Sequence, residues 1–244
     1  MRTLTFLTTV TLCLLLTTTS RAEGLLYRLP EDGVWVQFHT LVNAIEPDGK
    51  DVALNGTLTM SSVGTADVDG KRCRWIELKT EGKLNGEAVL FIDKLLIPEE
   101  NLAKGKDPFK HIVQAWQKHS MIENGKPRQI MDLEGNGAAH FKGIQPFMHG
   151  PYEKIEKLEP LSIETKLGKL LCEGIKAHEK TDQGGASFDS TFTIRLHESA
   201  PFGVVAWEGK SKVEQNGKDS GSMTVKLKVK DFGKDAKSGI PDAN

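Results

Sequence analysis

The chain has 244 residues, with 32 Lys and Arg against 33 Asp and Glu, so its formal net charge is −1 at pH 7. The two signs are interspersed without a basic block, which argues against a nucleic-acid-binding protein. The length suffices for one large or two small domains, and no apolar run beyond the N-terminal leader reaches the length that spans a bilayer.

Residues 1–22 have the features of a signal peptide. Arg2 gives a positive start, residues 6–16 form a short apolar core, and Ser20-Arg21-Ala22 places small residues at the −3 and −1 positions of a cleavage site. The core is too short and too rich in Thr to span a membrane. We therefore expect an exported protein, periplasmic or extracellular and of bacterial type, with no integral membrane span in its mature chain.

Asp-Gly and Asn-Gly pairs punctuate the rest of the chain and are strong hairpin signals. Both central residues of a type I′ turn need positive φ, which Asn, Asp and Gly tolerate best. Asn55-Gly56 lies inside a strand-like segment, so a β-bulge is the alternative there. The pairs are Asp32-Gly33, Asp48-Gly49, Asn55-Gly56, Asp69-Gly70, Asn85-Gly86, Asn124-Gly125, Asn136-Gly137 and Asn216-Gly217.

Two groups of strand-like segments lie between these turns. The last segment, 223–229, alternates strictly between apolar residues and Thr224, Lys226, Lys228 and Lys230, so one of its faces is predicted to be solvated. Several such segments at short intervals indicate an antiparallel meander. The first group comprises residues 34–42, 54–60, 74–78 and 89–92, and the second comprises 170–172, 188–196, 204–207 and 223–229.

One amphipathic helix is predicted over residues 108–119. Asp107 is a good N-cap and Pro108 suits the first helical position. A single apolar stripe follows at i, i+3, i+4 and i+7, and it has to be buried, most simply against the sheet. The stripe consists of Phe109, Ile112, Val113 and Trp116. A second, shorter helix is expected near residues 152–158, ended by Pro160.

These elements predict a mainly β (α+β) fold. We expect a curved antiparallel meander or open half-barrel with the amphipathic helix packed on it, as a single domain over residues 23–232. The polar residues 233–244 are predicted to form a flexible tail. The alternative is an all-β sandwich with the helix outside.

No motif assigns a catalytic residue, a metal ligand or a cofactor. His140 and His149 flank residues 141–148 and could meet at the neck of a loop, but their spacing matches no metal-binding motif. No Gly-x-Ser-x-Gly or Ser-x-x-Lys motif identifies a nucleophile, although a triad can assemble in space. Cys73 and Cys172 form either a disulfide or two buried free thiols.

Tryptophan positions suggest a ligand groove. Trp35, Trp75, Trp116 and Trp207 all lie in predicted strands or in the helix, where core packing is their common role. The alternative is that some of them line an apolar groove between sheet and helix, suited to an acyl chain or an apolar peptide. The predicted groove residues are Trp116, Val113, Phe38 and Trp207.

The run Ser199-Ala200-Pro201-Phe202-Gly203-Val204-Val205-Ala206-Trp207-Glu208 is similar to a segment of exported bacterial β-rich proteins, in which a Pro-x-Gly turn opens a strand near the end of a meander. With the leader, the strand count and the helix, the whole resembles the open half-barrels of periplasmic lipoprotein-localisation carriers. Those carriers hold acyl chains on an apolar concave face and use a key Arg, which no position of this chain matches.

The resemblance implies a non-enzymatic, exported binding module for an apolar ligand such as a lipid acyl chain or a lipoprotein. One alternative is a secreted hydrolase with a spatially assembled triad, in which His140 or His149 would be the base. The other is a structural or protein-interaction module without a small ligand. The expected partners are accordingly a lipid, a lipoprotein or another protein.

Overall fold

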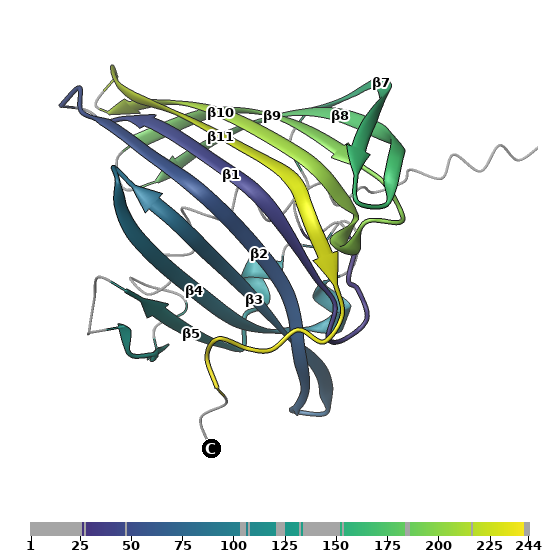
Figure 1. Cartoon of the computed structure of the whole chain (residues 1–244). Coiled ribbons are helices and arrows are strands. Elements are labelled where there is room, and N and C mark those ends of the chain that lie inside the picture. Colours follow the sequence, from purple (N-terminus) through teal and green to yellow (C-terminus); the bar gives the residue numbers. More distant parts are fainter. Residues whose placement is uncertain are drawn as a thin grey trace, which may run out of the picture.

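The described residues form one strongly curved antiparallel sheet of eleven strands (Figure 1). The computed structural model describes residues 26, 28–46, 48–102, 106, 108–120, 125–131, 133, 152, 154–183, 186–215 and 217–241, and only the backbone for 181–183, 186, 218 and 219. The strands are β1 (Trp35–Ile45), β2 (Asp51–Val68), β3 (Lys71–Leu84), β4 (Glu87–Pro98), β5 (Gln114–His119), β6 (Arg128–Ile130), β7 (Lys154–Thr165), β8 (Gly168–Gln183), β9 (Ala186–Leu196), β10 (Val204–Gln215) and β11 (Lys218–Gly233).

The strand order is β6-β5-β4-β3-β2-β1-β11-β10-β9-β8-β7. Strands β1 to β6, one wing of the sheet, therefore pair in sequence order, as do β7 to β11, the other wing, and β1 and β11 pair with each other in the middle of the sheet. The two edges of the sheet are β6 and β7. Strands β1–β4 and β8–β11 correspond to the two strand groups predicted from the sequence, so the antiparallel meander is confirmed. The described strands make one sheet and not the two layers of a sandwich.

Two tight hairpin turns, between β2 and β3 and between β3 and β4, lie at an Asp-Gly and an Asn-Gly pair, as the sequence predicts. Asp69 and Gly70 have φ of 50° and 75°, and Asn85 and Gly86 have φ of 51° and 92°. Positive φ at both central residues is the type I′ geometry that these pairs predict. By contrast, Gly56 lies within β2 in continuous register with both neighbouring strands, so the alternative of a bulge is wrong there.

Gly56 lies opposite Gly82 of β3 because the two backbones approach closely. A Cβ atom on Gly56 would lie 2.7 Å from the Gly82 Cα and 2.0 Å from the Glu81 carbonyl oxygen. Glycine within a strand is typical of such approaches and of sharp bends in a sheet. The pair therefore permits close strand packing where β2 and β3 meet.

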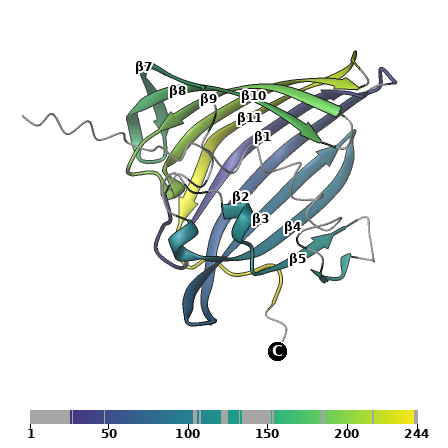
Figure 2. The ribbon, with the colours of Figure 1, turned by 180° about the vertical axis from the view of Figure 1, so that it is seen from behind.

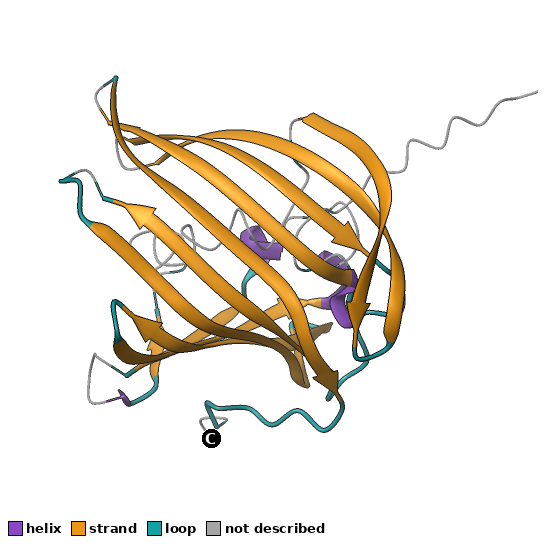
Figure 3. Ribbon diagram, turned by 45° about the horizontal axis from the view of Figure 1, so that its top comes forward, coloured by secondary structure: helices purple, strands orange, loops and turns teal. Residues whose placement is uncertain are grey.

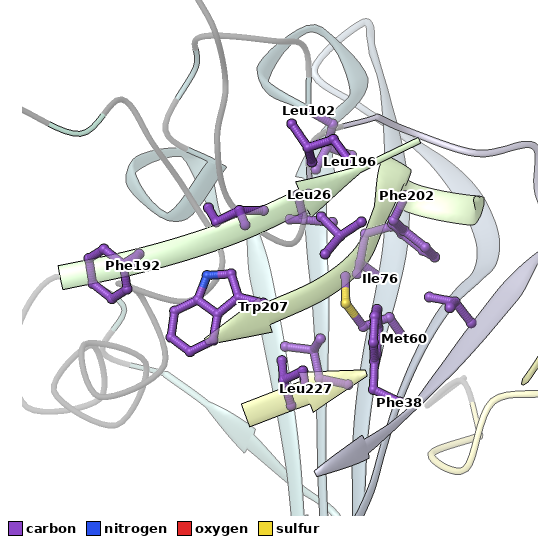
Figure 4. Close-up of a cluster of buried hydrophobic side chains, with 14 of the residues drawn as sticks. Leu26, Phe38, Met60, Ile76, Leu102, Phe192, Leu196, Phe202, Trp207 and Leu227 are labelled. Carbon is purple, nitrogen blue, oxygen red and sulfur yellow. The ribbon is translucent and has the colours of Figure 1, made fainter. Parts of the chain in front are cut away.

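The concave inner face of the sheet bears the hydrophobic core (Figure 4). In β11, for example, Val225, Leu227 and Val229 are buried, whereas the alternate lysines are exposed on the convex outer face, as the sequence predicts. The core draws on strands from both wings, so it ties the halves of the chain together. Its largest members include Phe38, Met60, Ile76, Leu95, Phe192, Phe202, Trp207 and Leu227.

The predicted amphipathic helix is not formed, and this part of the fold prediction is wrong. Residues 108–111 form the short 3₁₀ turn η2 (Pro108–His111), and residues 114–119 form β5, which pairs with β4. Pairing with β4 satisfies the backbone of β5 and buries Ala115, so a non-local contact overrides the local helical period. Phe109 and Ile112, two members of the predicted stripe, still pack against the core.

The other helical elements of the described residues are also short. They are η1 (Glu99–Asn101) and η4 (Pro201–Gly203), and Figure 3 shows helical turns within the curve of the sheet. The second helix expected near residues 152–158 is replaced by the start of β7. Within the described part of the chain, no helix has the length and apolarity needed to cross a membrane.

The segment after β11 crosses the outer face of β3 and β4. Glu77 and Lys94 are cross-strand neighbours there, and each is at least 97% buried. The Ser238 hydroxyl and the Gly239 N–H donate to Glu77 Oε2 at 2.7 and 2.9 Å, while Lys94 Nζ donates to the Ile240 carbonyl at 3.0 Å. Residues 238–240, within the region predicted to be a tail, thus cover two charged side chains.

A second polar network joins the first turn to β2. The Asp32 carboxylate accepts hydrogen bonds from the Ser62 hydroxyl at 3.0 Å and from the Gly64 N–H at 2.8 Å. Partial burial acts to raise the pKa of Asp32, but these hydrogen bonds outweigh it and lower the pKa below its ordinary value. The ionised carboxylate therefore stabilises this junction.

Candidate functional site

The β7–β8 hairpin folds back over the outer face because β7 bends. The register between β7 and β8 shifts between Leu158 and Leu161, which places Glu159 and Pro160 in a β-bulge. Proline cannot donate to a strand ladder and is tolerated at edges and bulges, and β7 is an edge strand. A bulge bends its strand, so the part of β7 after Pro160 turns away from the plane of the sheet.

Two contacts hold the bent hairpin in place. Ile163 packs on a small buried cluster made of Leu170, Cys172, Ala200 and Val205. At the hairpin turn, the Lys166 ammonium pairs with the Asp231 carboxylate of β11 and lowers the pKa of that carboxyl. Figures 1 and 2 show the hairpin tip beside the end of β11, far from it in sequence. These two contacts therefore attach the turn end of the hairpin to the outer face.

Arg195 of β9 joins the bulge to the sheet. Its Nη1 donates to the Glu159 carbonyl at 2.6 Å, which satisfies a carbonyl at the bulge. The guanidinium lies over Gly174 of β8, where a Cβ atom would be 2.3 Å from Nη1. The sequence thus places a glycine under the arginine and a proline beside the carbonyl that the arginine binds.

A groove of about 520 Å³ lies between the hairpin and the sheet. Its floor consists of two cross-strand rows on the outer face, and its wall consists of Leu161 and Ile163 of β7. This volume falls within the range of small-molecule sites. One row is Arg195, Ala206, Lys228 and His39, and the other is Thr193, Glu208, Lys226 and Leu41.

The groove combines an apolar wall with positive charge. Leu41 and Leu161 are exposed there, and the long aliphatic stems of Lys226 and Lys228 extend the apolar surface. Three cationic side chains and one carboxylate line the groove, so its formal charge is +2 when His39 is neutral. The carboxylate, Glu208, lies 4.0 Å from Lys226. The site is therefore amphipathic and cationic.

Two of the four residues predicted to line a groove lie in the core. Phe38 and Trp207 are at most 1% exposed and belong to the same inner cluster. The Trp207 ring lies 5.3 Å from the Phe192 ring and covers Gly209, where a Cβ would be 2.1 Å from the indole. Trp207 also borders the outer groove, although its ring packs on the inner side.

The other two predicted residues lie elsewhere. Trp116 is the cross-strand neighbour of Lys94 and thus projects from the outer face, opposite to Phe38. Val113 precedes β5, is 41% exposed, and donates its N–H to the Leu96 carbonyl at 2.8 Å. The structure therefore brings Phe38 and Trp207 together but not Trp116, and ligand contact by any of the four stays a prediction.

The other residues considered as metal ligands, catalytic groups or disulfide partners are two histidines and two cysteines. His140 and His149 lie outside the described residues. Cys73 and Cys172 are buried free thiols, and burial raises the pKa of both. Among the side chains that the structure describes, no group of three or more His, Cys, Asp or Glu residues is placed to hold a metal ion.

Leu161 and Arg195 line the groove but are not among the residues predicted to do so. A signal for the bend existed, since Pro160 interrupts a strand-like apolar pattern and therefore indicates an edge strand or a bulge. The alternation that exposes Lys226 and Lys228 was also visible. The contact that joins these features, between Lys166 and Asp231, links residues that are 65 positions apart and has no local signal.

No family model matches the sequence, and no characterised protein matches it with significant similarity. Among solved structures, the fold is similar to that of a Bacteroides fragilis protein assigned as exported, with a YmcC-like fold; the match has 9% identity, covers 88% of this chain and 100% of the other, and has a TM-score of 0.33.

Two further structures show weaker similarity. A protein assigned as AttH from Nitrosomonas europaea has 7% identity and a TM-score of 0.19, with 81% of this chain and 92% of the other covered. MucB in its complex with MucA(peri) has 10% identity and a TM-score of 0.17, with 84% and 94% covered. Similarities this distant carry no argument about the function of this chain.

Proposed function

We propose that the protein is an exported, non-enzymatic binding module that holds the acyl chain of a lipid or a lipoprotein in the groove beneath the β7–β8 hairpin. The observation that supports this proposal is the groove itself, with Leu161 and Ile163 as its wall and Leu41 on its floor. Apolar side chains exposed together in a concave site of this size are typical of small-molecule binding sites.

The wall of the groove is held in place by several contacts, and this supports a role in binding. The wall strand is bent by a bulge, anchored by Ile163 in a buried cluster, and tied to β11 through Lys166. A site whose walls are fixed before the ligand arrives loses less entropy on binding. The acyl chain would cover Leu41 and Leu161, which are otherwise exposed to water.

The test is the binding of a neutral probe, dodecanol, measured by displacement of a fluorescent acyl probe. Leu161→Asn should weaken binding about fivefold, since a half-exposed Leu contributes roughly 1 kcal/mol when a ligand covers it. Leu167→Asn is the matched control, because Leu167 lies in the same hairpin, is 47% exposed against 49% for Leu161, and does not line the groove.

Two outcomes contradict the proposal. One is that no acyl probe binds the wild-type protein at all. The other is that Leu161→Asn and Leu167→Asn weaken binding equally, which would place the acyl chain somewhere other than the groove. Native mass spectrometry of protein purified from its own source provides an independent check, because a bound lipid would add a defined mass.

A further inference from the structure

The outer face of β9, β10, β11 and β1 has an uneven distribution of charge. The whole chain has a formal charge of −1, yet the groove has a charge of +2 with His39 neutral. A second hollow of about 590 Å³ adjoins it on the same face and shares Thr193 and Glu208 with it. Lys176, Lys210 and Lys212 line that hollow, together with Asp189 and Glu208, so the positive surface continues beyond the groove.

We infer that the ligand of the groove is a monomeric anionic amphiphile, whose acyl chain lies against Leu41 and Leu161 and whose carboxylate or phosphate lies against Arg195, Lys226 and Lys228. This inference rests on the proposed function and adds the chemistry of the head group. Charge complementarity supports it, since a cationic concave site concentrates and orients anions.

Lys228 is the most direct contact for the anion. It is exposed, it neighbours His39 and Ala206 across the strands, and no described carboxylate pairs with it. Lys226 lies beside it along β11, two residues away, and is 4.0 Å from Glu208 at its nearest. Both ammonium groups therefore border the groove and can donate hydrogen bonds to a bound anion.

Arg195 differs from the lysines because it is fixed. Its Nη1 is bound to the Glu159 carbonyl, and the planar guanidinium has further N–H groups in rigid positions. A guanidinium held in this way presents its remaining donors to a carboxylate or phosphate with little further loss of freedom. Arg195 thus serves as a rigid contact at one end of a row in which Lys228 is the other cationic contact.

The experiment compares dodecanoate, dodecanol and dodecylamine with the full chain by displacement of the same fluorescent acyl probe. Dodecanoate should bind more tightly than dodecanol, and dodecylamine more weakly. Lys228→Gln should weaken dodecanoate about three- to fivefold and dodecanol by much less, since only dodecanoate loses a charge pair. Lys230→Gln is the matched control, because Lys230 is exposed on the same face of the same strand but does not line the groove.

The outcomes separate the inference from the function on which it rests. If dodecanol binds as tightly as dodecanoate, and Lys228→Gln affects neither, the groove binds acyl chains but the inference about the anion is wrong. If none of the three binds, the proposed function fails as well. Binding to anionic phospholipid vesicles without binding of monomeric dodecanoate would also overturn the inference, because the ligand would then be a membrane surface.

Discussion

Substitution of Ile240 by Ala tests whether the segment after β11 is an integral part of the fold. Ile240 is 1% exposed although it lies only four residues before the last residue of the sequence. The change removes three carbon atoms from a buried site, at about 0.8 kcal/mol each. We expect the free energy of unfolding to fall by roughly 2 kcal/mol, without a large cavity term because water can enter at the surface.

The matched control is Ile45→Ala, since Ile45 is 49% exposed at the end of β1. It should cost about half as much or less. Urea unfolding followed by tryptophan fluorescence measures both variants, and an unchanged m-value would show that the same surface is exposed on unfolding. If the two substitutions cost the same within about 0.5 kcal/mol, the segment does not pack on Glu77 and Lys94 and is a flexible tail.

Three further predictions follow from particular contacts. Gly209→Ala should destabilise the protein by about 1–3 kcal/mol and alter the near-ultraviolet circular dichroism, because its Cβ would lie 2.1 Å from the Trp207 ring; an unaltered spectrum would contradict this packing. Asp32→Asn should cost up to about 1 kcal/mol at pH 7, since Asp32 is exposed and screened. The folded-state pKa of Asp32 is lowered, so the stability that its carboxylate contributes is present above the ordinary pKa of 3.8 and is lost as the pH falls through the lower folded value. Urea melts in which Asp32→Asn costs as much stability at pH 2 as at pH 7 would refute this prediction. Cys73 and Cys172 should react with a chromogenic thiol reagent only in urea, because both are buried and free, and a disulfide-dependent shift in gel mobility would contradict the structure.

The strands and hairpins were predictable because their signals are local. The alternation of Val225, Leu227 and Val229 with lysines assigns the two faces of β11, and the positive φ at Asn85-Gly86 is a preference of those residue types. The mainly antiparallel β fold therefore follows from short windows of sequence.

The errors arose where distant contacts decide the structure. Residues 108–119 fit the helical period, but the pairing of Trp116 with Lys94 is part of a ladder that places residues 114–119 in a strand beside β4. The groove depends in the same way on the contact of Lys166 with Asp231. A periodicity within a short window contains no information about either partner, so neither feature could be derived from it.

The pairing of β1 with β11 has a consequence for the order in which the chain can fold. Trp35 of β1 lies opposite Gly233 of β11, so one edge of β1 stays unpaired until the chain has been made as far as β11. Unpaired strand edges invite aggregation, and closure over such a long span of sequence is slow. During synthesis the N-terminal wing thus has an unpaired strand edge. The addition of β11 then joins the two meanders into one cooperative unit.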